Sequence, residues 1–153
     1  MILRAGCLPL VPRPADQVAD AGELLQVALS DAAGLTQFGV YIETLSPGAR
    51  SSDRHWHEEE DEFLHVLTGT LTLVDNDGAD TLHPGDSIGW PRGVANAHHV
   101  WNRSDAPCSY LIMGSRMPRD VVHYPDDGRT LYNDPQGWRL VDSAGRLLRE
   151  GAS

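Results

Sequence analysis

Lysine is missing from this sequence of 153 residues, in which all 12 basic residues are arginine. Its absence excludes Schiff-base chemistry, a lysine general base and a lysine-containing phosphate loop, so any anion contact falls to arginine. The 22 acidic residues bring the formal net charge to −10. Because an acidic chain repels nucleic acid and anionic lipid, we expect neither nucleic acid nor a membrane as partner, but a small molecule.

Cysteines and long hydrophobic runs are also scarce. Cys7 and Cys108 are too few for a disulfide framework and form no CxxC pair. No apolar run approaches the roughly 20 residues that a membrane-spanning helix needs, and the first residues lack the pattern of a signal peptide. A cytoplasmic location is therefore expected.

Long helices are not expected either, because 15 glycines and ten prolines interrupt the sequence. About eight strand-length segments bounded by turn signals lie between residues 23 and 115, which favours an all-β sandwich or barrel. Asp31–Gly34 is expected to be a turn between two such strands. We expect residues 1–22 to form an extended, proline-containing arm and residues 116–153 to form a polar extension that ends in a hairpin around residues 142–145, with a short helix as the alternative in either flank. All three parts belong to a single domain.

A candidate metal site starts with His55-Trp56-His57. Because side chains alternate along a strand, the two imidazoles point the same way. Glu62 opens the next strand segment, so a fold-back brings its carboxylate beside them, and His98 adds a fourth group after the turn at residues 91–93. Three neutral nitrogens and one carboxylate suit one divalent ion such as Mn, Fe, Co, Ni or Zn, with water or substrate completing the coordination.

The spacing of these residues resembles the cupin superfamily. Gly48, His55, His57, Glu62 and Gly69 are similar to its first motif, and the second motif is similar to Gly85, Pro91, Gly93, His98 and Asn102. The resemblance, which is closest to small single-domain bacterial cupins of largely unassigned activity, implies a double-stranded β-helix, or jelly-roll, barrel and often a dimer. It assigns the metal to His55, His57, Glu62 and His98. The longer gap between Gly93 and this last ligand makes His99 the alternative, although the spacing to Asn102 favours His98.

Other polar residues near the motifs have simpler interpretations. His65 and His99 face away from the site by strand alternation, while His83 and His123 lie beside turns. Residues 58–61 are four consecutive acids, which favours a solvated turn over a calcium site. Four arginines flank the motifs and are either ligands of a substrate carboxylate or, as we favour, surface ion-pair partners: Arg50, Arg54, Arg92 and Arg103.

Strand alternation also sorts the apolar residues into an inward and an outward set. Leu64, Val66 and Val100 share the inward side with the candidate ligands. The outward set consists of Trp56, Phe63, Leu67 and Trp101. Because monomers seldom expose such a patch, either the N-terminal arm covers it or, as we favour, a second subunit does so in a homodimer.

Three classes of function remain open at this stage. The first is a metal-dependent oxygenase, isomerase or lyase acting on a small oxygenated molecule. A sugar-phosphate isomerase ranks lower within that class because lysine is absent. The second is a non-catalytic module that binds or senses a small molecule, and the third is a structural role with a closed metal site.

Overall fold

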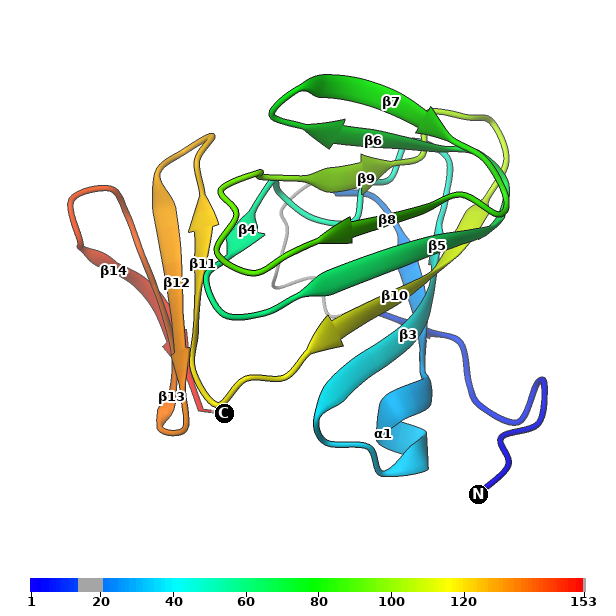
Figure 1. Cartoon of the computed structure of the whole chain (residues 1–153), viewed down its shortest axis with the longest axis horizontal. Coiled ribbons are helices and arrows are strands. Elements are labelled where there is room, and N and C mark those ends of the chain that lie inside the picture. Colours follow the sequence, from blue (N-terminus) through cyan, green and yellow to red (C-terminus); the bar gives the residue numbers. More distant parts are fainter. Residues whose placement is uncertain (14–20, 153) are drawn as a thin grey trace.

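The structure, a computed structural model, describes residues 1–13 and 21–152, which form three antiparallel sheets and one short helix (Figure 1). The all-β prediction is confirmed. Part of the expected N-terminal arm, residues 14–20, lies outside the described residues. No helix in the described ranges is long and apolar enough to cross a membrane.

The largest sheet has six strands in the order β1-β2-β3-β10-β5-β8. These strands are β1 (Val11–Pro12), β2 (Leu24–Ala28), β3 (Phe38–Leu45), β10 (Cys108–Ser115), β5 (Glu62–Thr68) and β8 (Ser87–Trp90). A smaller sheet with the order β7-β6-β9 lies above it in Figure 1 and consists of β7 (Gly78–Leu82), β6 (Leu71–Asp75) and β9 (His99–Trp101).

The hydrophobic core joins these two sheets. Leu45, Leu64 and Tyr110 of the larger sheet belong to the same buried cluster as Leu71 and Val100 of the smaller one. Alternate residues of each strand therefore point into one shared interior, as a barrel requires. The predicted inward positions of Leu64, Val66 and Val100 are confirmed, since each is at most 2% exposed.

A third sheet is built mainly from the C-terminal extension. Its order is β14-β13-β12-β11-β4, with β14 (Leu147–Gly151), β13 (Gly137–Val141), β12 (Arg129–Asp134), β11 (Asp120–Tyr124) and β4 (Trp56–His57). The expected hairpin around residues 142–145 is confirmed as the β13–β14 connection. Pairing of β4 with β11 brings this sheet to the edge of the barrel, at the left in Figure 1.

The segment expected to be a turn at Asp31–Gly34 is instead the end of a short helix, α1 (Leu29–Ala33). Gly34 ends it in the left-handed conformation, with φ of 71°, which glycine adopts without steric cost. Ser30 is fully buried, and its hydroxyl accepts a hydrogen bond from the Val40 backbone amide. The polar and small residues that suggested a turn are thus compatible with a single helical turn.

The four expected outward residues do not share one surface. Phe63 and Leu67 lie on the six-stranded sheet and are 42% and 39% exposed. Trp56 lies in the five-stranded sheet, stacked on His123 at 4.4 Å. Trp101 belongs to the three-stranded sheet, and its indole donates to the Gly48 carbonyl. Strand alternation predicts the side of a strand, but not the sheet to which the strand belongs.

Candidate metal centre

Backbone pairing places two of the four candidate ligands, His55 and His98, side by side. His55 and His98 form an isolated antiparallel bridge in which each backbone amide donates to the other's carbonyl, at 3.2 and 2.9 Å. His57 follows two residues later on β4, so its side chain points to the same side as that of His55. Glu62 is the first residue of β5. Three separate segments thus bring together all four residues expected from the sequence.

The three imidazoles converge on one carboxylate oxygen of Glu62. Glu62 Oε2 lies 2.9 Å from His98 Nε2, 3.6 Å from His57 Nε2 and 3.9 Å from His55 Nε2. Each of the four side chains is less than 20% exposed. Ligand atoms of His55, Glu62 and His98 all lie within 4.8 Å of one another, a grouping that suits a metal ion.

The other ring nitrogen of each histidine faces an oxygen acceptor. Nδ1 of His55 lies 2.9 Å from the Asp53 carbonyl, and Nδ1 of His98 lies 2.9 Å from the Asn96 carbonyl. Carbonyl oxygens only accept hydrogen bonds, so each Nδ1 carries the proton, and in the neutral ring Nε2 keeps its lone pair. Nε2 of His98 and Glu62 Oε2 are only 2.9 Å apart, so either a proton in a hydrogen bond or a metal cation must lie between them. The donor set therefore fits a transition-metal ion.

His57 differs from the other two because its Nδ1 meets a carboxylate. Asp120 Oδ2 lies 2.5 Å from this nitrogen, and Asp120 Oδ1 accepts from the Glu59 backbone amide at 3.0 Å. Asp120 is buried and belongs to β11. A residue from the C-terminal extension therefore orients a candidate metal ligand, and no local sequence pattern had pointed to it.

The protonation of the site follows from burial and from these contacts. Burial lowers the pKa of His55 to about 4, so its ring is neutral at pH 7. Burial also opposes ionisation of Glu62, but the His98 hydrogen bond and the surrounding imidazoles outweigh it and lower the pKa to about 2. For His57, burial is outweighed by the Asp120 hydrogen bond and by the charge of Glu62, so its pKa is raised.

An aromatic ring also packs against the site. The Trp90 indole is stacked on the His98 imidazole, with 3.8 Å between ring centres and an angle of 8° between the planes. Trp90 ends β8 and is 8% exposed. The stack restricts rotation of the His98 ring and excludes water from one of its faces.

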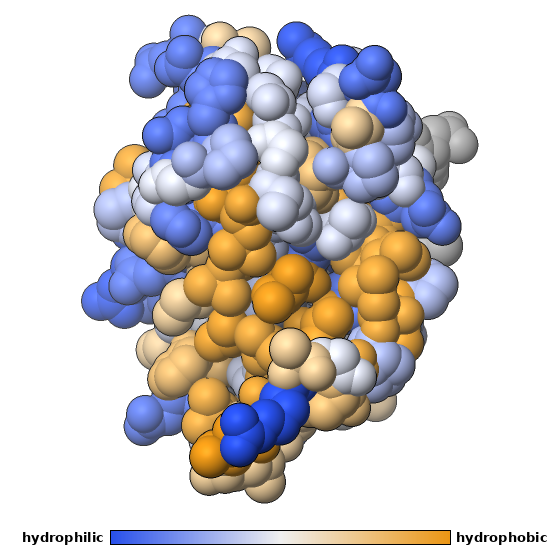
Figure 2. All heavy atoms as spheres, turned by 90° about the vertical axis from the view of Figure 1, so that its right-hand side faces the viewer, coloured by the Kyte–Doolittle hydropathy of each residue, from blue (hydrophilic) through white to orange (hydrophobic). Residues whose placement is uncertain are grey.

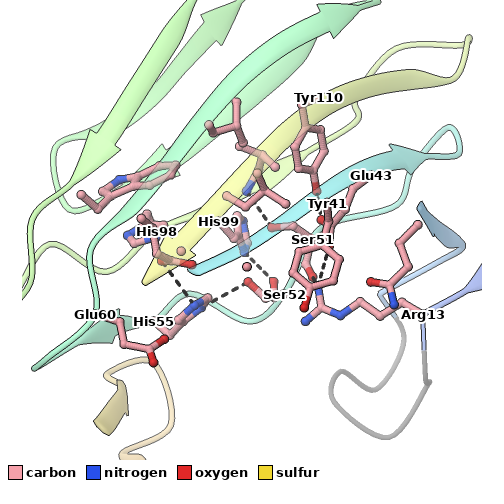
Figure 3. Close-up of a pocket in the computed structure, with 18 of the residues that line it drawn as sticks. Arg13, Tyr41, Glu43, Ser51, Ser52, His55, Glu60, His98, His99 and Tyr110 are labelled. Atoms are coloured by element: carbon pink, nitrogen blue, oxygen red, sulfur yellow. Dashed lines mark hydrogen bonds and ion pairs between the residues drawn. The ribbon is translucent and has the colours of Figure 1, made fainter. Parts of the chain in front are cut away.

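Three of the four candidate ligands, His55, Glu62 and His98, line a cavity of about 500 Å³ inside the barrel. Figure 3 shows His55 and His98 in its wall. This volume is within the range of small-molecule sites. Beyond His55 and His98, the cavity is lined by polar groups that include Arg13, Tyr41 and Glu43. Glu43 is only 6% exposed, and its Oε2 accepts a hydrogen bond from the buried Tyr110 hydroxyl at 2.6 Å. Burial raises the pKa of this carboxyl group.

The other histidines take no part in this convergence. The prediction that His99 faces away from the site is wrong, because its ring lines the same cavity as His98. His99 Nδ1 is nevertheless directed to the Ser52 carbonyl, at 2.9 Å. His65 contacts the Ser87 hydroxyl, and His123 contacts Glu58. His83, beside the turn at residues 84–85, is exposed.

The four arginines chosen from the sequence line neither cavity at this site. Arg50, Arg54 and Arg92 form ion pairs with nearby carboxylates, and Arg103 lies over the Trp101 ring. The arginines that do line the cavities come from distant parts of the chain and carried no local signal: Arg13, Arg116, Arg129 and Arg149.

Comparison with known proteins identifies the family. The cupin domain family matches residues 41–114, which include every candidate ligand. A crystal structure of a sugar phosphate isomerase of the cupin superfamily from Silicibacter pomeroyi is 34% identical over 97% of both chains, with a TM-score of 0.88. The chain therefore belongs to the cupin superfamily, and its fold is a jelly-roll barrel.

Two further structures support the same fold. A putative sugar phosphate isomerase from Acidithiobacillus ferrooxidans is 35% identical, covering 84% of this chain and 83% of its own, with a TM-score of 0.77. A predicted oxalate decarboxylase from Thermotoga maritima is 20% identical over 76% of this chain and 100% of its own, with a TM-score of 0.64, and is similar in fold alone. No curated protein matches this sequence significantly.

Proposed function

We propose that the chain is a metal-dependent isomerase of a small polyhydroxylated anion, with sugar phosphates as the best-supported substrate class. The observation that carries this proposal is the convergence of three imidazoles on Glu62, beside a polar cavity of about 500 Å³ that is lined by His55, Glu62 and His98. Two of the structures named above support the choice of reaction, since one is called a sugar phosphate isomerase and the other a putative sugar phosphate isomerase.

We assign one divalent transition ion to His55, His57, Glu62 and His98. An ion there would act as a Lewis acid towards substrate oxygen atoms. Burial of the four side chains and the fixed Nδ1 contacts hold the ligand atoms in place before the ion binds. The cavity beside them gives a substrate room to approach.

Interconversion of an aldose and a ketose moves one proton between neighbouring carbon atoms, which needs a group that takes the proton and returns it. We assign this role to Glu43, which lines the same cavity as His55 and His98. Burial raises the pKa of Glu43, which makes its carboxylate a stronger base towards the substrate proton. Tyr110 donates to one carboxylate oxygen and Arg13 lies 3.7 Å from the other, so both neighbours fix its position.

Arginines replace the missing lysines near the site. A dianionic phosphate needs cations, and the absence of lysine had ranked this substrate class low. The fold brings Arg13 and Arg116 to the first cavity, and Arg129 and Arg149 to a neighbouring one. The positive charges that a phosphate needs are thus supplied by arginines from opposite ends of the chain.

The test is isomerisation in D₂O by metal-loaded protein purified without affinity-tag metals. Aldose and ketose phosphates should interconvert and gain deuterium at the carbon next to the carbonyl, as followed by NMR. Glu43→Gln should lower the rate by about 10²–10⁴-fold while the metal content stays unchanged. Glu59→Gln changes an exposed carboxylate outside both cavities and should leave the rate unchanged.

Other outcomes would assign the protein differently. Binding of sugar phosphates without interconversion or deuterium uptake would favour a sensing module. Oxygen consumption with a keto acid, diketone or phenol would favour an oxygenase instead.

We also propose that two copies pair through the outer face of the six-stranded sheet. Neighbouring strands present apolar residues there in two rows, Val27-Ile42-Leu111 and Val40-Met113-Phe63. Apolar residues gather into a broad area on the side of the molecule where β3 and β10 lie (Figure 2). Phe63 stays 42% exposed among the described residues, so a second copy is the cover that we favour.

A further inference from the structure

A second cavity, of about 440 Å³, lies between the candidate metal ligands and the five-stranded sheet. Both cavities are lined by Arg13, Ser52, His55, Glu60 and Glu62. They therefore flank the same ligands, one inside the barrel and the other against the C-terminal sheet. The lining residues from β11 to β14 lie outside the region that matches the cupin domain family.

Strand register shows how the sheet faces this cavity. One row across β11, β12, β13 and β14 consists of Val122, Leu131, Leu140 and Arg149, and the row two residues away contains Asp120, Asn133 and Trp138. Residues two apart share a face of a strand. Because Asp120 reaches His57 from this face, the whole face looks towards the metal centre. It offers an apolar floor with an arginine on its edge strand.

Arginines gather at this cavity in an otherwise acidic chain. Three of the 12 line it: Arg13, Arg129 and Arg149. Arg129 is held by Asp53 and Asp127, so its charge helps to dock the sheet on the barrel. Arg149 lies over the Trp138 ring, 5.9 Å from its centre. A guanidinium beside an aromatic wall suits an oxyanion attached to a ring or carbon chain.

We propose that the C-terminal sheet recognises the oxyanion end of the substrate, with Arg149 as the binding cation and Trp138 as the wall against which the carbon skeleton packs. This inference rests on the proposed function only in placing the other end of the molecule at the metal centre. It makes the C-terminal sheet a specificity element of a barrel whose metal ligands all lie in the family-matched region. The oxyanion is a phosphate or a carboxylate.

The test compares ligands with and without the oxyanion on metal-loaded protein. Fructose 6-phosphate, gluconate and fructose are titrated by calorimetry into wild type, Arg149→Gln and Arg139→Gln. Arg139 is the matched control, because it lies on the adjacent strand β13 at alternate parity to Trp138 and Leu140 and contacts Tyr132 instead. Arg149→Gln should weaken the binding of one of the two anions about tenfold or more and leave the binding of fructose unchanged. Whichever anion responds identifies the phosphate or the carboxylate.

A second measurement reports the place of binding without any turnover. Inorganic phosphate, or acetate if gluconate is the anion that responds, should shift the Trp138 indole N–H signal in NMR, assigned with Trp138→Phe. It should do so in metal-free His98→Ala protein as well, because Arg149 does not depend on the ion. Equal losses in Arg149→Gln and Arg139→Gln, or an unmoved Trp138 signal, would overturn the proposal. Isomerisation with an unchanged KM in Arg149→Gln would overturn it while the proposed reaction stands. Anion binding at Trp138 without isomerisation would support the oxyanion site and contradict the proposed isomerase reaction.

Discussion

Adjacent histidines at positions 98 and 99 face different partners, and this difference can be tested directly. His98 Nε2 lies 2.9 Å from Glu62 Oε2, whereas His99 Nδ1 is bonded to the Ser52 carbonyl. His98→Ala removes one of four donors, so metal content should fall sharply. His99→Ala should keep its metal. Elemental analysis after metal-free purification measures both, and the reverse result would move the fourth ligand by one residue.

Asp120 is hydrogen-bonded to the candidate ligand His57 and should affect metal binding through it. Its hydrogen bond outweighs the effect of burial and raises the pKa of His57, so the ring tends to hold a proton that a metal must displace. Metal affinity should therefore rise as pH increases through that raised pKa. Asp120→Ala should lower the affinity about 10–100-fold and change the absorption spectrum of the Co²⁺ form, while Asp120→Asn should lose less.

A matched control separates orientation of His57 from docking of the C-terminal sheet. Asp126 also joins that sheet to the barrel, through Arg54, but touches no candidate ligand. Asp126→Asn should therefore leave metal affinity and the Co²⁺ spectrum unchanged. If both variants weaken metal binding alike, Asp120 supports the sheet rather than the ligand.

At the scale of elements, two turn glycines should differ in how much stability the protein loses when each is replaced by alanine. Both have positive φ, 81° at Gly48 and 75° at Gly69. A Cβ on Gly48 would meet nothing within 4 Å, whereas a Cβ on Gly69 would lie 2.7 Å from Cys108 Cβ. Gly48→Ala should lower the free energy of unfolding by about 1–2 kcal/mol. Gly69→Ala should cost about 1–3 kcal/mol more, because the β5–β6 turn must also shift away from β10. Urea denaturation of the metal-free proteins compares the two, and equal losses would contradict the close approach.

Local patterns predicted the barrel and the grouping of the candidate ligands better than they predicted the C-terminal sheet. Alternation along short strands was enough to place His55, His57 and Glu62 together, because the fold-back between them is local. Asp120 lies 63 residues beyond His57, and their contact depends on β4 pairing with β11. Arg149 likewise reaches the cavity only through successive pairings from β11 to β14. Long-range register of this kind leaves no periodic signal in a single sequence.

At the scale of the whole molecule, the apolar outer face predicts a dimer. Burial of several large side chains provides a strong association term, each contributing roughly 1.5–3 kcal/mol before entropic costs. Phe63→Asp places a charge at the exposed end of one apolar row of this face and should give a monomer by light scattering at micromolar concentration. Val94→Asp is the control, since Val94 is 52% exposed in a loop outside that sheet. A wild-type protein that is already monomeric would contradict the prediction.

The stack of Trp90 on His98 has a consequence for observing the protein. A paramagnetic ion bound to His98 would lie one imidazole away from an excited indole, close enough to shorten its emission lifetime. Addition of Co²⁺ or Mn²⁺ to metal-free protein should dim the intrinsic fluorescence, and Trp90→Phe should abolish most of this response despite the other three tryptophans. If Trp90→Phe keeps the full response, another indole reports on the ion. If Trp90→Phe loses the response, the fluorescence of Trp90 reports metal occupancy in real time and without an added label.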